Sequence, residues 1–496
     1  MSTAVLPVPR AVPQVLTLTL RTMRERWRST FGWGLGLALI GVMQLAVYPS
    51  VANSSEGMQA FVDQWPEALR EAFSLDAYTT GAGFLNAEMF SMMIPLVLIA
   101  VATTAAAAAT AGEEERGTAD LLLSLPVSRG RVVAAKVLAG VVSVVLVAGA
   151  TWLVIVLGAP IVDLDVGAGD LAAGIVMTTL LAWFFGAVTL LIGAATGKRA
   201  IALGVGVGLA LAAFLLNALA PMADWLEPWQ KASPFDWALG GEPLLNGIDW
   251  PMAWLLLVLS ILLVAIAIST MIWRDDWGMA RNDALFLVAL GTQCLFLALR
   301  LESREEVAAL VGFSALGMGM EWYNTAAGNW TYPDTGLFTL GNVPLFVGAM
   351  YAAVGVCVLR MIRIFDMRFA PFPPLWPTVF LTLAIYVNFF TQHLWIDLRV
   401  WLMAATVLLF GRTWISFTPM RGRRWRMPML LSLLLSALGV WLAENLGTLT
   451  GTWLYDGQET HDPVSFATLG SWYLFLCVAL MVALAALPEA AHPDEN

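Results

Sequence analysis

Two acidic residues in the C-terminal half each open the same spaced motif. The pattern Glu-x6-Gly-x-Trp-x-Tyr occurs in MEWYNTAAGNWTYPD (320–334) and in AENLGTLTGTWLYDG (443–457). A carboxyl group costs about 2.5–3.5 kcal/mol at the centre of a membrane helix, so two of them at the ends of apolar runs favour a functional role. The chemistry would be acid catalysis, in which one carboxyl stays protonated and the other stabilises positive charge. The candidate catalytic residues are Glu321, Glu444, Tyr332 and Tyr455.

The same motif allows a simpler interpretation. Both glutamates could lie hydrated at the membrane interface, with Trp330 and Trp453 as aromatic anchors. Each copy is followed by Thr-Leu-Gly, at 339–341 and 468–470, which is expected to open the next span. The duplication predicts two helix pairs that face each other. Further polar residues expected to converge with the glutamates are Asn324, Asn329, Asn388, Asn445, His393 and Asp397.

The elements that must position these residues are membrane helices. The chain has 496 residues and is 59% hydrophobic and only 12% charged, and its mean hydropathy is +0.76. Soluble domains are about 45–50% apolar and about 25% charged. Apolar runs of about 17 to 25 residues recur from residue 31 to residue 487. The sequence therefore predicts an all-α polytopic membrane protein with about 13 transmembrane helices.

These helices divide into two groups at a polar junction, residues 274–283. We expect a first domain over 31–278 and a second module over 279–496. The first domain holds six expected spans: 31–51, 89–111, 132–160, 171–195, 200–220 and 251–273. The second module holds about seven: 284–299, 307–322, 338–358, 375–391, 398–412, 428–446 and 468–487.

Residues 1–30 are expected to form an amphipathic helix on the membrane surface. Apolar residues recur there at three- and four-residue steps, and Arg21, Arg24 and Arg28 occupy the neighbouring face. A solvated basic leader is the alternative. No short apolar core precedes a cleavage site, so we expect no cleavable signal peptide.

Basic residues near the span ends predict the orientation. In the first half they fall on one side, which the positive-inside rule assigns to the cytoplasm together with the N-terminus. In the second half, counting the spans would place Arg360, Arg363, Arg368 and the run RGRRWR (421–426) outside. Three explanations stay open: a miscounted span, a re-entrant segment at 284–299, or two joined modules.

The segment GEEERGTADLLLSLPVSRGR (112–131) lies between the second and third expected spans. It predicts a short cytoplasmic helix that has carboxylates at its N-terminus and an apolar patch at Leu121, Leu122 and Leu125. Pro126 ends the helix, and Ser128 is a suitable N-cap for the next span. An ordinary polar turn is the alternative, but a turn needs no apolar patch, whereas a docking element does.

This segment resembles the permease subunits of ABC-2-type transporters. Their form E-x-E-x-G-T-x-x-x-L-L-S-x-P-V/I-S-R is matched closely, and the resemblance covers about residues 10–278, including SPFDWALGGEPLLNGIDW (233–250). It implies a permease driven by a separate ATP-binding subunit, which the short helix contacts. It further implies an inner-membrane homodimer or heterodimer of permease halves. The coupling residues would be Glu113, Glu115, Arg116, Gly117, Thr118, Leu122, Leu125, Pro126, Ser128 and Arg129.

We expect this chain to bind no cofactor itself. The nearest match to a phosphate-binding loop, GAATGKR (193–199), is one residue short between its glycines, and Arg199 stands where Ser or Thr is required. ATP and Mg²⁺ would therefore sit on the partner subunit. Three cysteines and three histidines are scattered along the chain, so no metal site is expected. Nothing indicates a nucleic-acid partner.

The C-terminal half resembles a membrane family of unknown function, DUF817. The resemblance covers about residues 280–488 and rests on EWYNTAAGNWTYPD, LGNVPLFVGAMYAAVG, RIFDMRFAPFPPLWP, FGRTW and WLAENLGT. It implies no activity. The repeated glutamate-ended helices are similar, more distantly, to carotenoid-acting membrane cyclases and hydratases, whose acidic residues protonate a polyene. The alternative function is therefore a membrane enzyme acting on an isoprenoid-like lipid through Glu321 and Glu444.

Overall fold

The computed structural model divides the chain into two compact units, Met1–Ile272 and Trp273–Asn496. Each unit is described by itself. The residues that the structure describes are 14–54, 64, 78, 80–110, 129–223, 226–273, 278–298, 303–333, 336–391, 397–418, 424–449, 451–458 and 464–491.

A helix occupies each of the predicted spans. Within the described ranges, nine helices are long and apolar enough to cross a bilayer. The remaining expected spans form α13 (Arg281–Ala298), α14 (Arg304–Ala326), α16 (Leu375–Thr391) and α17 (Arg399–Phe410). The prediction of an all-α polytopic membrane protein is therefore confirmed.

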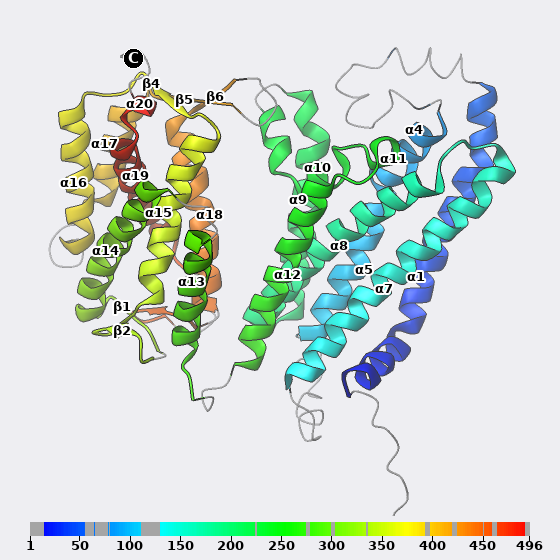
Figure 1. Ribbon diagram of the computed structural model, residues 1–496, viewed down its shortest axis with the longest axis horizontal. Coiled ribbons are helices and arrows are strands. Elements are labelled where there is room, and N and C mark those ends of the chain that lie inside the picture. Colours follow the sequence, from blue (N-terminus) through cyan, green and yellow to red (C-terminus); the bar gives the residue numbers. More distant parts are fainter. Residues whose placement is uncertain are drawn as a thin grey trace, which may run out of the picture. The chain divides into compact units, whose positions relative to one another are not determined.

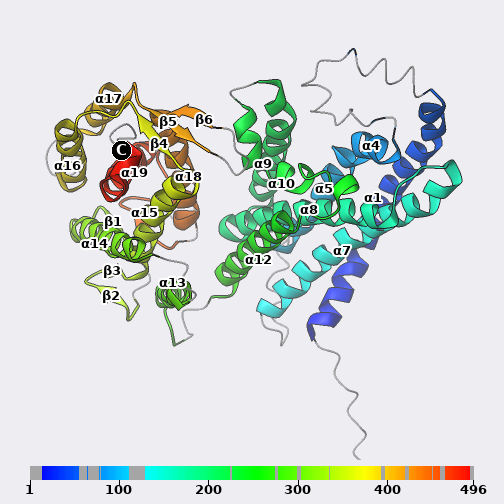
Figure 2. The ribbon, with the colours of Figure 1, turned by 45° about the horizontal axis from the view of Figure 1, so that its top comes forward.

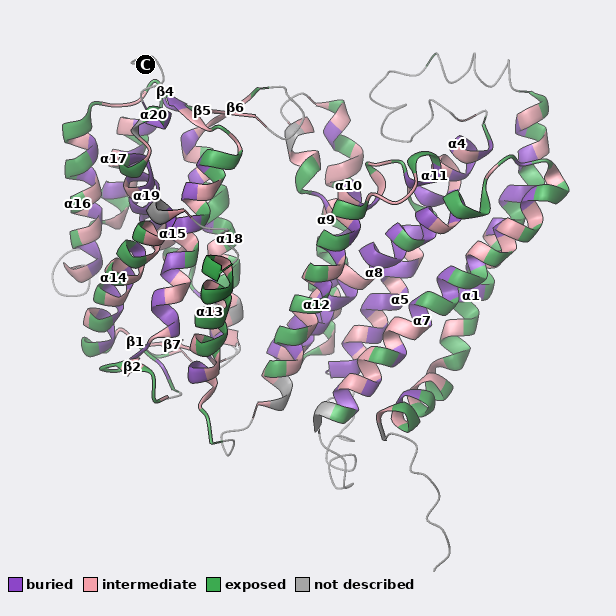
Figure 3. Ribbon diagram, in the orientation of Figure 1, coloured by how far each residue is buried: buried purple, intermediate pink, exposed green. Residues whose placement is uncertain are grey.

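The first unit is a helix bundle built around α8 (Ala168–Thr196). This helix is mostly buried because α5, α7, α9 and α12 all pack against it (Figure 3). The long helices of the unit are α1 (Gln14–Asn53), α5 (Met93–Thr110), α7 (Arg129–Gly158), α8, α9 (Arg199–Leu219) and α12 (Trp250–Ile272) (Figure 1). Short helices connect them: α4 (Gly81–Leu85), η1 (Asn86–Phe90), η2 (Ala159–Val162), η3 (Ala220–Met222), η4 (Glu227–Ala232), α10 (Pro234–Leu239) and α11 (Pro243–Asn246).

The expected surface helix and the first span form one continuous element. Helix α1 has 40 residues, and its only internal proline is Pro49. At 1.5 Å per residue it is about 60 Å long, roughly twice the thickness of a bilayer core. Its basic N-terminal part packs against α7, where the Thr19 hydroxyl donates to the Ala135 carbonyl at 3.3 Å. No helix breaker separates the two segments, so the helix runs through both.

The second unit is a bundle around α19 (Phe466–Ala486), which contacts α14, α15, α16, α17 and α18. Figure 2 shows these helices arranged around α19. Its other helices are α15 (Phe346–Ile364), α18 (Met429–Leu449) and the short α20 (Pro488–Ala491). A three-stranded sheet at one end of this unit consists of β4 (Arg368–Ala370), β5 (Trp414–Phe417) and β6 (Trp425–Pro428) (Figure 1).

Two short strand pairs lie at the opposite end of the second unit. Strand β1 (Trp330–Thr331) pairs antiparallel with β7 (Leu454–Tyr455), and β2 (Thr339–Leu340) pairs with β3 (Val343–Pro344). The expectation that Thr-Leu-Gly opens a span is wrong for the first copy. Gly341, at a φ of 63°, turns the β2–β3 hairpin instead, and α15 begins only at Phe346. The second copy does lie in α19.

Helix α13 crosses the whole second unit. At its start, Arg281 Nη2 donates to Thr452 Oγ1 at 2.6 Å, within the second motif copy. The next helix, α14, begins at the opposite end, where Arg363 Nη1 donates to Ser303 Oγ at 3.1 Å. Within the described ranges, α13 is one continuous helix of 18 residues and is not among the nine candidate membrane spans, so the re-entrant interpretation of 284–299 stays a prediction. The apolar run was short because polar residues 281–283 belong to the helix.

Asp283 should be important for the stability of this end of the second unit. Its side chain is 2% exposed, and its carboxylate accepts from the backbone N–H groups of Leu337 at 2.7 Å and Phe338 at 2.8 Å. We expect Asp283→Ala to lower the free energy of unfolding by about 1–3 kcal/mol, because it leaves buried donors unpaired. The melting temperature in detergent measures this. Asp283→Asn keeps one acceptor oxygen and should lower the melting temperature less. Equal decreases for the two variants would contradict the assigned role.

Candidate functional site

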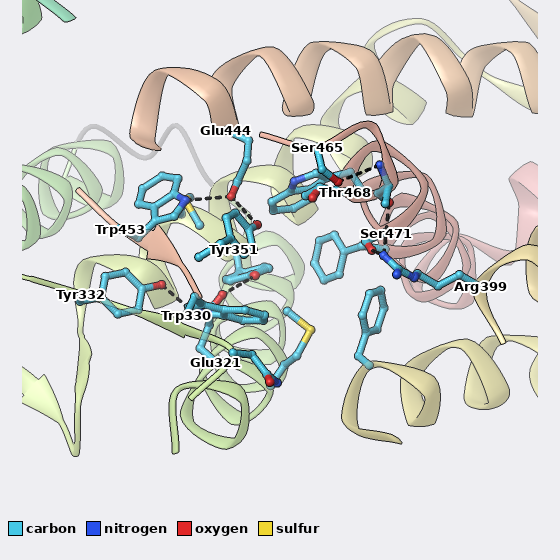
Figure 4. A pocket seen from close by; sticks show the side chains of 18 residues that line it. Glu321, Trp330, Tyr332, Tyr351, Arg399, Glu444, Trp453, Ser465, Thr468 and Ser471 are labelled. Carbon is cyan, nitrogen blue, oxygen red and sulfur yellow. Dashed lines mark hydrogen bonds between the residues drawn. The ribbon is translucent and has the colours of Figure 1, made fainter. Parts of the chain in front are cut away.

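Glu321 lies near the C-terminal end of α14 and is 4% exposed. Its carboxyl group accepts three hydrogen bonds. Trp330 Nε1 and the Tyr332 hydroxyl donate to Oε2 at 2.6 and 2.8 Å, and the Tyr351 hydroxyl donates to Oε1 at 2.7 Å. Figure 4 shows these side chains in place. Both carboxyl oxygens are therefore held by aromatic donors.

Glu444 repeats this arrangement near the C-terminal end of α18, and it is 5% exposed. Trp453 Nε1 and the Tyr455 hydroxyl donate to its Oε1 at 2.8 and 2.7 Å. Figure 4 shows Trp453 beside Glu444. Both acids are thus buried and bound by the tryptophan and the tyrosine of their own motif copy. This geometry does not fit the interpretation in which both glutamates are hydrated at the membrane interface.

The spacing of the motif follows from the backbone. Gly328 and Gly451 have φ of 80° and 66°, a left-handed conformation that reverses the chain after each helix. The following residues form β1 and β7, in which Trp330 pairs with Tyr455. Because alternate residues of a strand share one face, the tryptophan and the tyrosine two positions later both point back at the glutamate.

The glycine of the motif should be hard to replace. Nothing lies within 4 Å of a Cβ added at Gly328, so Gly328→Ala causes no steric clash with neighbouring residues. Its cost is that of holding an alanine at a positive φ. We expect it to lower the free energy of unfolding by about 1–2 kcal/mol. Gly319→Ala is the matched control, since Gly319 is helical and equally open, and it should be neutral or stabilising. Equal melting temperatures for the two variants would contradict this account.

The two glutamates line one cavity of about 210 Å³ in the second unit. Its walls are mostly aromatic and sulfur-containing, and Tyr351 stacks on Trp472 with ring centroids 6.2 Å apart. Several of its residues come from elements distant in sequence. The residues that line it include Glu321, Asn329, Trp330, Tyr332, Tyr351, Arg399, Glu444, Trp453, Tyr455, Ser471 and Trp472.

Arg399 faces this cavity from α17 and is the one arginine among the described residues that line it. Arg399 Nη2 contacts Asp397 Oδ2 at 2.6 Å, and Arg399 Nη1 donates to Ser471 Oγ at 3.1 Å. The cavity therefore has two buried acids in one wall and a paired guanidinium in another (Figure 4). The sequence did not indicate Arg399, Tyr351 or Trp472 as site residues, because they lie outside the two copies of the glutamate motif.

The other polar residues expected near the glutamates have mainly structural contacts. Asn324 Oδ1 accepts from Asn329 Nδ2 at 2.7 Å, and of these two only Asn329 lines the cavity. Asn388 Oδ1 accepts from the Leu398 N–H at 3.2 Å, and Asn445 Oδ1 accepts from the Val464 N–H at 2.9 Å. His393 lies outside the described residues.

The tyrosines of the motif act as donors. Burial raises the pKa of Tyr332 and Tyr455 well above the usual value of a phenol, and the charge of the neighbouring glutamates adds to the rise. Both phenols therefore stay protonated at neutral pH. The described residues contain no group of three or more His, Cys, Asp or Glu side chains that could hold a metal ion. The arrangement can bind an apolar or cationic group against aromatic rings and two acids.

The coupling residues from Glu113 to Ser128 lie outside the described residues. The described ends of their connection are Thr110, at the end of α5, and Arg129, at the start of α7. Thr110 packs against Gly193, near the turn between α8 and α9. Thr110, the last described residue before the coupling segment, therefore lies beside this turn.

Comparison with known proteins identifies both halves. The sequence model described as "ABC-2 family transporter protein" matches residues 16–234, and that described as "Protein of unknown function (DUF817)" matches residues 247–480. The chain is also similar to the "Uncharacterized protein YoaT" of Bacillus subtilis (strain 168), at 31% identity over 254 residues, which are 50% of this chain and 95% of that protein. The N-terminal half of the chain thus matches the ABC-2 transporter family model, and the C-terminal half matches the DUF817 model.

Proposed function

We propose that the first unit is the permease of an ABC transporter, driven by a separate ATP-binding subunit that docks on residues 112–131. The observation that carries this proposal is the ABC-2 family match over residues 16–234. The six long helices of the unit and the motif between α5 and α7 agree with it. ATP and Mg²⁺ would be bound by the partner, and this chain would convert the movement of that partner into transport.

Basic residues support a cytoplasmic N-terminus and an inner-membrane location. Arg26 of α1 lies close enough to Arg199 for their charges to interact, so the basic start of α1 and the α8–α9 turn lie together. Thr19 contacts Ala135, near the start of α7. The described ends of the coupling segment lie at this same end of the first unit (Figure 1). The positive-inside rule assigns such an end to the cytoplasm.

We also propose that two permease halves, identical or different, associate to form the transport pathway. In line with this, much of the surface of α1, α9 and α12 is apolar and exposed within the described chain, including Leu39, Leu211 and Val258. Such a surface can contact either lipid or a second permease half.

Purification tests the transporter proposal. The tagged full chain, extracted from its host membrane in mild detergent, is expected to bring with it a second polypeptide that hydrolyses ATP. Mass spectrometry identifies that polypeptide, and an ATPase assay on the same fraction measures its activity. A chain that purifies without any ATP-binding partner and without ATPase activity would contradict the proposal.

A second candidate function rests on the cavity of the second unit. Two buried glutamates and an aromatic wall suit an enzyme that protonates an unsaturated, isoprenoid-like lipid, since aromatic rings stabilise the developing positive charge. The observation that favours this candidate is the paired geometry of Glu321 and Glu444, each held by its own tryptophan and tyrosine. The two candidates concern different units, so both can hold.

A further inference from the structure

An apolar groove of about 400 Å³ lies within the first unit. Four helices form it: α5, α7, α8 and α12. Its volume is in the usual range for a site that holds a small molecule. Residues Leu257 to Ile268 of α12 run along it, a distance of about 16 Å at the helical rise. The groove is thus long enough for an extended hydrocarbon chain.

Small side chains create this groove. Its α5 wall consists of Ala102, Ala105, Ala106 and Ala109, from the alanine run that precedes the coupling segment. Gly140 of α7 packs closely on Ala105, where an added Cβ would lie 3.2 Å from the alanine Cβ. Larger residues on α5 would fill the space. The alanine run therefore leaves room beside the helix that ordinary apolar residues would occupy.

Among the described residues that line the groove, one is charged, and the others present almost only hydrocarbon. Lys136 of α7 lines it seven residues after the helix begins, near the end where α5 stops. The Ser260 hydroxyl, which also lines it, is already bonded to the Leu256 carbonyl at 2.6 Å. Ile261 of the α12 wall is 59% exposed, so the groove opens onto the apolar outer surface of the first unit.

We propose that this groove binds one acyl chain of an anionic phospholipid, with the lipid phosphate at Lys136. The hydrocarbon wall accounts for the chain, and charge complementarity accounts for the head group, because a basic residue at the membrane surface attracts anionic lipid. The binding site adjoins the helix that follows the coupling segment. The proposal goes beyond the transport role and does not depend on it.

Native mass spectrometry of the purified full chain tests the site. The probes are dioleoyl phosphatidylglycerol and dioleoyl phosphatidylcholine, added in equal amounts. Wild-type protein should retain phosphatidylglycerol about fivefold over phosphatidylcholine. Lys136→Gln should equalise the two lipids, and Lys136→Arg should keep the preference. A preference that survives Lys136→Gln would overturn the assignment of the head group.

A filled groove provides the second arm of the test. Ala106→Phe should abolish the retained lipid, because the phenyl ring occupies the space beside α5. Ala108→Phe is the matched control: Ala108 is a partly exposed alanine of the same helix that does not line the groove, and it should keep the lipid. Equal retention by the two variants would overturn the site. This readout needs no ATPase, so it stands or fails separately from the transporter proposal.

Discussion

Replacing Leu122 with aspartate is expected to remove the ATP-binding subunit from the purified complex. Leu122 belongs to the apolar patch of the coupling segment, and burying a leucine against a partner contributes about 1.5–3 kcal/mol. A carboxylate at that position adds the cost of desolvating a charge. Since each 1.4 kcal/mol changes affinity tenfold, the ratio of ATPase subunit to tagged chain should fall at least ~tenfold. Quantitative mass spectrometry of the eluate measures this ratio.

Leu245→Asp is the control for that experiment. Leu245 is 49% exposed in α11, in the connection between α9 and α12 at the other end of the first unit (Figure 1). The same chemical change there should leave the subunit bound. If Leu122→Asp kept its ATPase subunit and its transport activity, residues 112–131 would not be the docking element, whatever the family of the chain.

The number and class of the helices could be read from the sequence because apolar runs of bilayer length are a strong signal. The boundaries of the helices and the connections between them were harder to predict. Residues 281–283 are polar, so the apolar run stopped short of them, yet Asp283 is buried and accepts from the backbone N–H groups of Leu337 and Phe338, just before β2. The β2–β3 hairpin itself depends on the left-handed Gly341. Tertiary hydrogen bonds determine where such helices begin, and a hydropathy pattern carries no information about these bonds.

The sequence predicted the motif residues of the acidic cavity but not the residues that distant helices contribute to it. The motif placed each glutamate with its own tryptophan and tyrosine, because all three are close in sequence. Tyr351 and Arg399 join the cavity from α15 and α17, where no local pattern distinguishes them. The one available signal was chemical: a tyrosine inside an apolar helix needs a partner for its hydroxyl, and here that partner is Glu321, at 2.7 Å.

Replacing both glutamates of the second unit is the other change with a large expected effect. In Glu321→Gln/Glu444→Gln, the amide oxygens can still accept from Trp330 and Trp453, so the fold should survive, but neither side chain can give up a proton. Since general acid catalysis contributes about 10²–10⁴-fold, formation of a lipid or pigment product should fall by at least ~100-fold. Chromatography and mass spectrometry of host lipid extracts would compare wild-type, variant and chain-free membranes.

The control for this variant is Glu489→Gln, an exposed acid of α20 at the opposite end of the second unit. It should leave the lipid profile unchanged. The ATPase subunit should co-purify with all three proteins, because the coupling segment is intact in each. A product that persists in the double variant, or a lipid profile that is the same with and without the chain, would exclude acid catalysis by this glutamate pair and leave the cavity as a binding site.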